Sequence, residues 1–312
     1  MRKLILKVTI LILCFGCASS KQTGFDDYVF QNKKEKNTYI NAYNQALNLW
    51  PVPYTEDTVD TPYGPAHVII SGPEDGKQMV LLHGMDASST MWYPNIKALS
   101  EKHRVYAIDF LMEPGKSALT KNALTSEEII IWYNSIFEHY HLKNFDLVAA
   151  SRGGWIATLL AIQQNQNINK LVLLSPAQTF EYVDNLRQTS QALFLKLFPS
   201  KKKFERTLET FSSHPEKINS IYKKQFYLAN KYAKTNTSML QMKPFSDEEL
   251  RSITIPVLVL IGDADVINSE ESLEKADELL FRDKTEVIES AGHFLSIDQS
   301  EAVNKAITTF LE

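Results

Sequence analysis

The chain alternates between short apolar runs and longer amphipathic segments. Seven of the apolar runs have the length of a strand, and they carry continuous Val, Ile and Leu residues rather than alternating apolar and polar positions. Continuous runs are typical of parallel strands that are covered on both faces. The predicted strands are residues 67–71, 79–83, 105–110, 145–150, 170–175, 255–262 and 285–289.

Helix patterns lie between most of these runs. Thr125, followed by Glu128 three residues later, forms the start signal of one helix. The predicted helices cover residues 90–100, a segment that begins at residue 125, residues 154–164 and residues 300–311. This alternation of strands and helices predicts a three-layer α/β fold with a mostly parallel sheet.

Another helix is predicted ahead of the first strand. Tyr39, Tyr43, Ala46 and Trp50 recur at spacings of four, three and four residues, which places them on one apolar face. Pro51 then ends the helix, because proline lacks the backbone N–H that the next turn needs.

The alternation of predicted strands and helices is interrupted between residues 175 and 255. This interval has no strand signal, and residues 181–243 contain twelve Lys and Arg against five Asp and Glu. A structureless loop of that length is uncommon in a compact domain, so we expect a helical cap insertion at about residues 177–252. The Lys201-Lys202-Lys203 run is either a solvated face or a surface that attracts an anionic partner, such as a membrane.

The first seventeen residues have the pattern of an export signal. A positive start is followed by an apolar run at residues 8–15, which is too short to cross a bilayer. Gly16-Cys17 resembles the cleavage point of a bacterial lipoprotein signal, and the only other cysteine of the chain is Cys14. We therefore expect an extracytoplasmic protein that is lipid-anchored at Cys17. A secreted or simply tethered chain and an unprocessed cytosolic chain are the alternatives.

The domain prediction follows from these patterns. Residues 1–17 form the export signal, residues 18–60 an N-terminal helical extension, and residues 61–312 the α/β domain with its cap insertion. Composition agrees with a folded protein, because 44% of the 312 residues are hydrophobic and 22% are charged. The net charge of −4 gives no basic excess for nucleic acid. No His or Cys pair has metal-ligand spacing, so neither zinc nor calcium is expected.

Ser151 is the candidate nucleophile. It follows the predicted strand 145–150 directly, and a helix pattern begins just after it, which is the context of a nucleophile elbow. Such a turn requires small residues two before and two after the serine, since larger ones would collide, and these are Ala149 and Gly153. Glycine is usual at the first position, so Ala149 departs from the pattern.

A serine hydroxyl needs a base to take its proton. Of the seven histidines, His293 lies in the loop after the last predicted strand, at the edge of the sheet where Ser151 is expected. Asp265 and Asp263 follow the preceding strand and can supply the acid that orients the imidazole. We favour Asp265, with Asp263 as a turn or cap residue. The order Ser, Asp, His is that of α/β-hydrolases.

The oxyanion of such a reaction needs two backbone donors. One is expected from the N–H of Arg152, directly after the nucleophile. The other is expected from Met85, because Gly84 lets the preceding loop approach closely. His83 is interpreted as a side chain that braces this loop.

From Ser71 onward the chain resembles the α/β-hydrolases, and more narrowly the small bacterial carboxylesterases of the naproxen-esterase type. The segments that carry this resemblance are Leu49-Trp-Pro-Val52, Ser71-Gly-Pro-Glu-Asp75, Leu81-Leu-His-Gly84, Ser88-Ser-Thr-Met-Trp-Tyr-Pro-Asn-Ile96, Ser175-Pro-Ala177, Phe245-Ser-Asp-Glu-Glu-Leu-Arg-Ser252 and Gly292-His-Phe-Leu-Ser296. The resemblance implies a serine carboxylesterase with a cap and no cofactor. It puts Ser151, Asp265 and His293 on the triad positions of that family.

The chain departs from the family at three of these positions. Ala149 replaces the usual glycine, Asp265 stands where similar proteins carry Glu, and Arg152 stands where Leu or Met is commoner. The Arg152 side chain is expected either to face the acyl pocket or to pair with a neighbouring acid such as Asp109.

Three functions remain open at this level. The first is hydrolysis of a small-molecule ester through an acyl-serine intermediate. The second keeps the triad but acts on a lactone, thioester or amide, performs perhydrolysis, or cleaves a carbon–carbon bond. The third is a catalytically inactive, lipid-anchored binding protein on the same scaffold.

Overall fold

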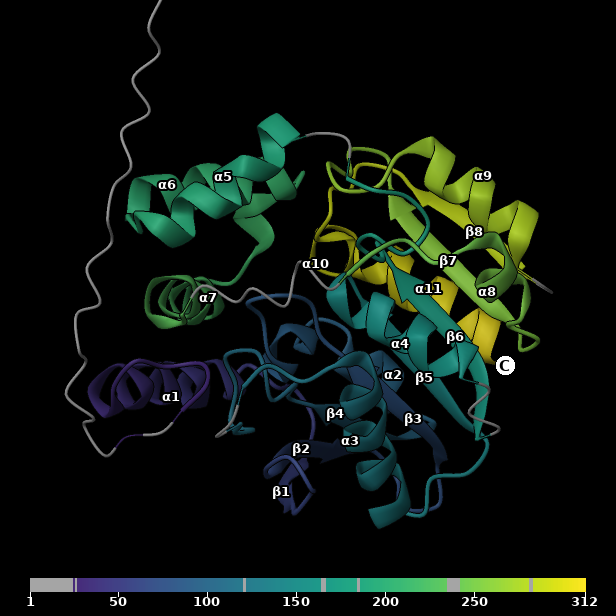
Figure 1. Cartoon of the computed structure of the whole chain (residues 1–312), viewed down its shortest axis with the longest axis horizontal. Coiled ribbons are helices and arrows are strands. Elements are labelled where there is room, and N and C mark those ends of the chain that lie inside the picture. The colour runs from purple at the N-terminus through teal and green to yellow at the C-terminus, as the bar shows by residue number, and fades with distance from the viewer. Residues whose placement is uncertain are drawn as a thin grey trace, which may run out of the picture.

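The computed structural model describes residues 25, 27–119, 122–163, 167–183, 186–234, 242–280 and 283–312. The expected export signal, with Cys14 and Cys17, lies outside the described residues. Eight strands form one sheet (Figure 1). They are β1 (Tyr54–Val59), β2 (Ala66–Ser71), β3 (Lys77–Leu82), β4 (His103–Ile108), β5 (Phe145–Ala150), β6 (Ile168–Leu174), β7 (Val257–Gly262) and β8 (Asp283–Ile288).

The strand order in the sheet is β1-β2-β4-β3-β5-β6-β7-β8. The pairs β1–β2 and β2–β4 are antiparallel, and every other neighbouring pair is parallel. The predicted three-layer α/β fold with a mostly parallel sheet is thus confirmed. The carboxyl ends of β3 to β8 meet at one edge, which is where such sheets place their sites.

Strand β1 is absent from the sequence prediction. Its first five residues are exposed and only Val59 is buried. It therefore lacks the apolar run by which the other strands were found. Strand β5 coincides with the predicted range 145–150, and the remaining strands begin or end within two residues of their predictions.

Successive side chains of a strand point to opposite faces of the sheet, so the buried strands form two hydrophobic cores, one on each face. In β5, Leu147 and Ala149 join the core on one face, and Val148 and Ala150 join the core on the other. Both faces are apolar because both are covered by helices.

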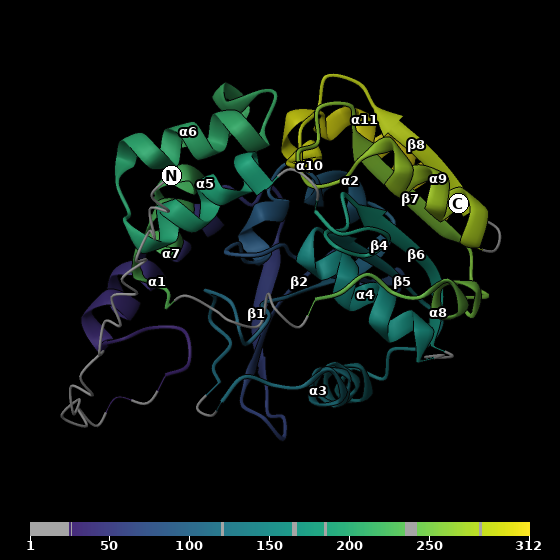
Figure 2. The same ribbon diagram turned by 45° about the horizontal axis from the view of Figure 1, so that its top comes forward.

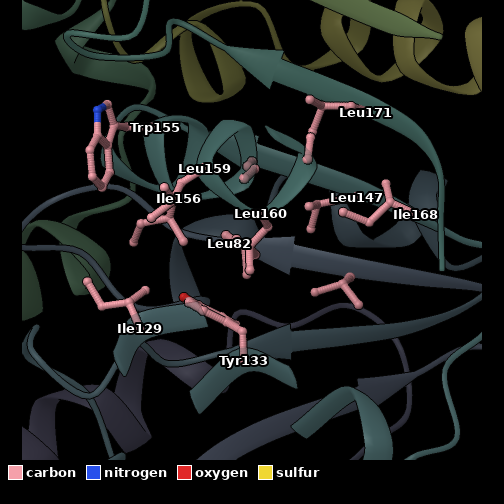
Figure 3. Close-up of a cluster of buried hydrophobic side chains, with 14 of the residues drawn as sticks. Leu82, Ile129, Tyr133, Leu147, Trp155, Ile156, Leu159, Leu160, Ile168 and Leu171 are labelled. Carbon is pink, nitrogen blue, oxygen red and sulfur yellow. The ribbon is translucent and has the colours of Figure 1, made fainter. Parts of the chain in front are cut away.

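Figure 3 shows the first of these cores in close-up. Leu82 of β3, Leu147 of β5 and Leu171 of β6 lie opposite Ile156 and Leu160, which come from the helix that follows the candidate nucleophile. This packing fixes the start of that helix against the end of β5.

Among the described residues, four helices contribute buried side chains to the first core, and five helical segments outside the connection between β6 and β7 contribute to the second. The first set is α3 (Ser126–His139), α4 (Arg152–Ile162), α8 (Asp247–Arg251) and α9 (Glu270–Leu279). The second set is α1 (Lys33–Leu47), the 3-10 turn η1 (Ser89–Trp92), α2 (Ile96–Leu99), α10 (Leu295–Asp298) and α11 (Ser300–Leu311). The capping box of Thr125 and Glu128 is present at the start of α3.

The single helix predicted over residues 90–100 is wrong. The structure has η1 and α2 there as separate elements, because Pro94 lacks the N–H that would join them. The predicted helix 154–164 begins two residues earlier, directly after Ser151.

Most of the described residues between β6 and β7 are helical. They form α5 (Leu186–Leu197), α6 (Lys201–Phe211), the 3-10 turn η2 (Pro215–Lys217) and α7 (Ser220–Tyr232). These elements, called the cap below, lie together to one side of the sheet, and α1 runs beside α7 (Figures 1 and 2). Over the residues that the structure describes, no helix is both long and apolar enough to span a bilayer.

Candidate active site

Ser151 occupies a strained turn between β5 and α4. Its backbone has φ 51° and ψ −116°, a combination that costs a non-glycine residue about 1–3 kcal/mol. The surrounding chain holds it there, since Ser151 N–H donates to Leu174 O at 2.9 Å and Ala177 N–H donates to Ser151 O at 3.2 Å. The turn therefore depends on the end of β6 as well as on its own sequence.

Position 153 requires glycine for a different reason from the one inferred above. A Cβ on Gly153 would lie 2.6 Å from Leu82 O and 2.7 Å from His83 O. The nearest obstacle to a side chain at position 153 is thus the backbone of β3 and not Ala149. Ala149 is fully buried within β5, and its methyl group is accommodated there.

The structure brings Ser151, His293 and Asp265 together, although they are far apart in the sequence. His293 Nε2 lies 2.9 Å from Ser151 Oγ, and His293 Nδ1 lies 3.0 Å from Asp265 Oδ1. A carboxylate only accepts hydrogen bonds, so Nδ1 carries the hydrogen and Nε2 offers its lone pair to the serine hydroxyl. This is the protonation pattern that a base for Ser151 needs.

The environment of Asp265 keeps its carboxyl ionised. Burial alone would raise the pKa of Asp265, but the His293 imidazole and hydrogen bonds from Asn268 and the Ile267 N–H lower it below its usual value. An ionised carboxylate holds the imidazole in its orientation and stabilises the imidazolium when it forms.

Asp263 has a different position. Its two carboxylate oxygens accept the backbone N–H groups of Ser290 and Ala291 at 2.9 and 3.0 Å. It contributes to the shape of the loop that carries His293, without contacting the imidazole. The Asp263 pKa is lowered by these two backbone hydrogen bonds.

Asp298 is a site-supporting residue that the sequence reasoning missed. Its carboxylate is fully buried and accepts hydrogen bonds from the Ser212 hydroxyl and from the N–H groups of Ser213 and Gly292. It thereby ties the end of α6 to the loop just before His293. The sequence offers one hint of this role, because Asp298 lies five residues after His293. The three hydrogen bonds that its carboxylate accepts cannot be predicted from sequence, because two of them come from the segment after α6.

The cap also contacts the histidine directly. The Phe211 ring lies edge-on to the His293 ring, with centroids 5.9 Å apart, and Phe211 O accepts the Phe294 N–H at 3.1 Å. The C-terminal end of α6 is therefore part of the wall around the site.

The loop expected to carry an oxyanion donor lies against Ser151. A Cβ on Gly84 would be only 3.2 Å from the Ser151 Cβ, so glycine permits this loop to approach the serine closely. The second expected donor, the Arg152 N–H, belongs to the first residue of α4, where backbone N–H groups and the helix dipole favour negative charge.

His83 braces the same loop, as its sequence interpretation states. The ring is buried, its Nε2 accepts the Phe110 N–H at 2.8 Å, and its Nδ1 lies 2.8 Å from Gly84 O. Nδ1 must therefore carry the hydrogen, and the ring is neutral. Burial lowers the pKa of His83, which agrees with the neutral form.

The acid that pairs with Arg152 is Glu113, and the suggested partner Asp109 is wrong. The Arg152 guanidinium donates to Glu113 Oε1 in a pair buried at both ends, and it lies 5.0 Å from the centroid of the Phe110 ring. The other carboxylate oxygen, Oε2, accepts the Asp86 N–H at 2.9 Å. One buried carboxylate therefore connects the segments that carry both expected oxyanion donors.

The ion pair continues into the cap. Lys196 of α5 forms a salt bridge with the side chain of Asp86. The backbone of Asp86 has a positive φ of 57°. The contacts Lys196–Asp86–Glu113–Arg152 thus run from the cap to the residue that follows the nucleophile.

Asp109 and His67 form a second buried pair, and the exposed residue Glu56 of β1 joins it. His67 lies between Asp109 Oδ2 at 3.1 Å and Glu56 Oε2 at 2.8 Å. Burial alone would lower the pKa of His67, but hydrogen bonds to the two carboxylates raise it to about 9. His67 is therefore a charged, structural histidine at neutral pH. In the described part of the chain, no group of three or more His, Cys, Asp or Glu side chains is placed to hold a metal ion.

Comparisons with known proteins identify the family and the fold of the chain. Residues 77–300 match the family model described as the alpha/beta hydrolase fold. The uncharacterized carboxylesterase nap of Bacillus subtilis is 31% identical over 280 residues, which cover 87% of this chain and 91% of the relative. Carboxylesterase YbfK of the same organism is 29% identical over 281 residues, 88% of this chain and 93% of its own.

Solved structures give the same result. The crystal structure of naproxen esterase from Bacillus subtilis has a TM-score of 0.84 and 31% identity, covering 90% of this chain and all of the other. That of carboxylesterase CesB (YbfK) has a TM-score of 0.80 and 28% identity, over 89% and 98% of the two chains. The chain therefore belongs to the α/β-hydrolase family and is similar, over most of its length, to small bacterial carboxylesterases.

Proposed function

We propose that this protein hydrolyses carboxylic esters through an acyl-serine intermediate, with Ser151 as nucleophile, His293 as base and Asp265 as the orienting acid. The observation that carries the proposal is the continuous hydrogen-bond chain from Ser151 Oγ through the imidazole to a buried carboxylate. The similarity to carboxylesterases supports an ester as the substrate.

The first half of the reaction forms the acyl-enzyme. Ser151 Oγ attacks the ester carbonyl carbon while its proton passes to His293 Nε2. The carbonyl oxygen becomes an oxyanion, for which the backbone N–H groups of Met85 and Arg152 are the proposed donors. The imidazolium then returns the proton to the departing alkoxide, the C–O bond breaks, and the alcohol leaves.

The second half repeats these steps with water. His293 takes a proton from the water, whose oxygen attacks the acyl carbon and forms a second oxyanion at the same donors. When this intermediate collapses, the imidazolium gives the proton to Ser151 Oγ and the carboxylic acid is released. Asp265 remains ionised throughout and stabilises the imidazolium at both stages.

Arg152 does not place a free charge beside the acyl group in this mechanism. Its guanidinium is paired with Glu113 and buried, so the proposal expects neutral acyl groups rather than acids as substrates. The inactive binding protein is less well supported, because the three side chains are already in hydrogen-bonding positions.

We also propose that the protein is exported and anchored to a bacterial membrane by a lipid on Cys17. The support is the pattern of residues 1–17, with a positive start, a short apolar run and Gly16-Cys17. Metabolic labelling with a radioactive fatty acid tests it: the label should enter the intact chain and be lost in Cys17→Ala.

A substrate panel tests the reaction. The purified protein should release p-nitrophenol from short-chain p-nitrophenyl esters and should turn over matched lactones, thioesters and anilides far more slowly. Ser151→Ala should retain only the roughly 10³–10⁴-fold acceleration over water that an oxyanion hole and binding can supply. Faster turnover of a lactone or amide than of every ester would overturn the assignment.

A further inference from the structure

The cap carries a cluster of exposed apolar side chains. Phe194, Leu197 and Phe198, on α5 and just after it, are 54%, 51% and 63% exposed. Leu197 and Phe198 follow Phe194 by three and four residues, which places both side chains next to Phe194 on one side of a helical turn. Large apolar side chains gathered in this way are typical of surfaces that bind a membrane or a protein.

Three lysines follow directly. Lys201 and Lys202, at the start of α6, are exposed. The Lys203 ammonium lies 5.0 Å from the centroid of the Phe198 ring and donates to Phe198 O at 3.0 Å. Ammonium groups and apolar side chains therefore lie side by side, which is the combination found where proteins lie at the surface of an anionic bilayer.

The distribution of charge over the whole chain favours an anionic partner. Residues 181–243, which contain the cap, have a surplus of seven positive charges, whereas the whole chain has a net charge of −4. The rest of the chain therefore carries −11. An anionic surface attracts the cap and repels the remainder, so it orients the molecule with the cap toward it.

The position of the N-terminal segment agrees with this orientation. Lys234 N–H donates to Val29 O at 2.8 Å, and Phe30 pairs with Ala233 just after α7. The chain thus enters the fold beside the cap. Asp27 follows Cys17 by ten positions, and ten residue steps reach at most about 35 Å. A lipid on Cys17 would therefore hold this side of the molecule close to the bilayer.

We propose that the surface formed by Phe194, Leu197, Phe198, Lys201, Lys202 and Lys203, called the docking face, binds an anionic lipid bilayer. The orientation relative to the anchor depends on the location proposed above, but the binding does not depend on the esterase reaction. Helix α6 runs for 11 residues from the docking face to Phe211, which contacts His293. That length is about 16 Å, so docking brings the site to within a short distance of the membrane.

Vesicle binding tests the proposal. The chain from Ala18 to Glu312 retains every described residue and lacks the apolar run at residues 8–15, which would bind lipid by itself. It should sediment with phosphatidylglycerol vesicles and bind phosphatidylcholine vesicles at least about tenfold more weakly, with the difference reduced in high salt.

Two variants of the docking face separate its parts. Replacing Lys201, Lys202 and Lys203 together by Gln should weaken binding to phosphatidylglycerol about a hundredfold. Replacing Phe194, Leu197 and Phe198 together by Ser should weaken it at least about tenfold.

A matched control lies on the α/β body. Ile131 of α3 and Val287 of β8 are 46% and 48% exposed, and their joint replacement by Ser should leave binding within about twofold. All variants should hydrolyse a soluble short-chain ester at the rate of the unchanged chain, since none of these residues contacts the site.

Three results would overturn the docking proposal. The first is equal binding to both kinds of vesicle, and the second is unchanged binding by the variants. The third is a dimer in light scattering that the Ser variant dissociates, because the occupant is then a second copy. Loss of esterase activity with intact vesicle binding would remove the proposed function and leave the docking proposal standing.

Discussion

The α/β body and the cap use charged side chains in opposite ways. Around the site, the body buries its charges in pairs, as with Arg152 and Glu113 or His67 and Asp109. The cap leaves Lys201 and Lys202 exposed beside apolar side chains. Buried pairs fix the geometry of a site, whereas exposed charges remain free to attract a partner. This contrast supports the two proposals, that the body performs the chemistry and that the cap binds the membrane surface.

The sharpest contrast is expected within the body, between two acids that are two residues apart. Asp265→Asn should reduce kcat by about 10³–10⁴-fold, because the amide favours the wrong imidazole tautomer. Asp263→Asn should cost less than about tenfold, because one oxygen can still accept a backbone N–H. Steady-state kinetics on a p-nitrophenyl ester measures both. Equal losses would mean that Asp265 has no special relation to His293.

The next largest effect is expected on the free energy of unfolding, from the buried pair of Arg152 and Glu113 next to the nucleophile. Glu113→Gln leaves the Arg152 charge buried without its counter-charge, and should lower the free energy of unfolding by about 3–5 kcal/mol. The double variant Glu113→Gln, Arg152→Leu should recover much of this loss. Urea denaturation gives the values. If the double variant is as unstable as the single one, the charge is not the cause.

The contacts of His67 with Asp109 and Glu56 predict a dependence of stability on pH. The pKa of His67 is about 9 in the fold, against an ordinary 6.5, so its charged form stabilises the folded state fully below pH 6.5. This contribution, of the order of 3 kcal/mol, should disappear as the pH rises through 9. His67→Gln should flatten the profile of unfolding free energy between pH 6.5 and 9. An unchanged slope in this variant would assign the dependence to another group.

The smallest effect on the fold is expected in the cap. Replacing Lys201, Lys202 and Lys203 by Gln should change the free energy of unfolding by less than about 0.5 kcal/mol. Thermal denaturation is the measurement, with Lys196→Gln as the comparison, because Lys196 is largely shielded from water in a pair with Asp86. A large loss from the three exposed lysines would show that the cap, like the body, uses its charges for stability.

The same contrast explains what the sequence could predict. The buried strands and the turn at Ser151 can be predicted from short segments of sequence, because the strands are apolar runs and the turn is a strand–serine–helix pattern. His293 and Asp265 were found because loops after parallel strands share one edge of the sheet. Strand β1 was missed because it is exposed, and helix α9 was overlooked although Leu273, Ala276 and Leu279 form an apolar face.

Pairs of residues that are far apart in the sequence could not be predicted from the pattern of apolar and polar positions. Glu113 is 39 residues from Arg152, and no local signal distinguishes it from Asp109 as the partner. Asp298 is likewise defined by contacts to Ser212 and Gly292, which only the folded chain brings together. Such contacts follow from tertiary packing, so the sequence predicted the chemical groups of the site better than the residues that hold them.

Direct detection of the acyl-enzyme tests the central claim. The protein is mixed with excess p-nitrophenyl ester, quenched in acid during turnover, digested and examined by mass spectrometry. One acyl group should be found on the peptide that contains Ser151, and it should be absent from Ser151→Ala, which should also be inactive. Full turnover by Ser151→Ala, or an acyl group on another residue, would contradict the account.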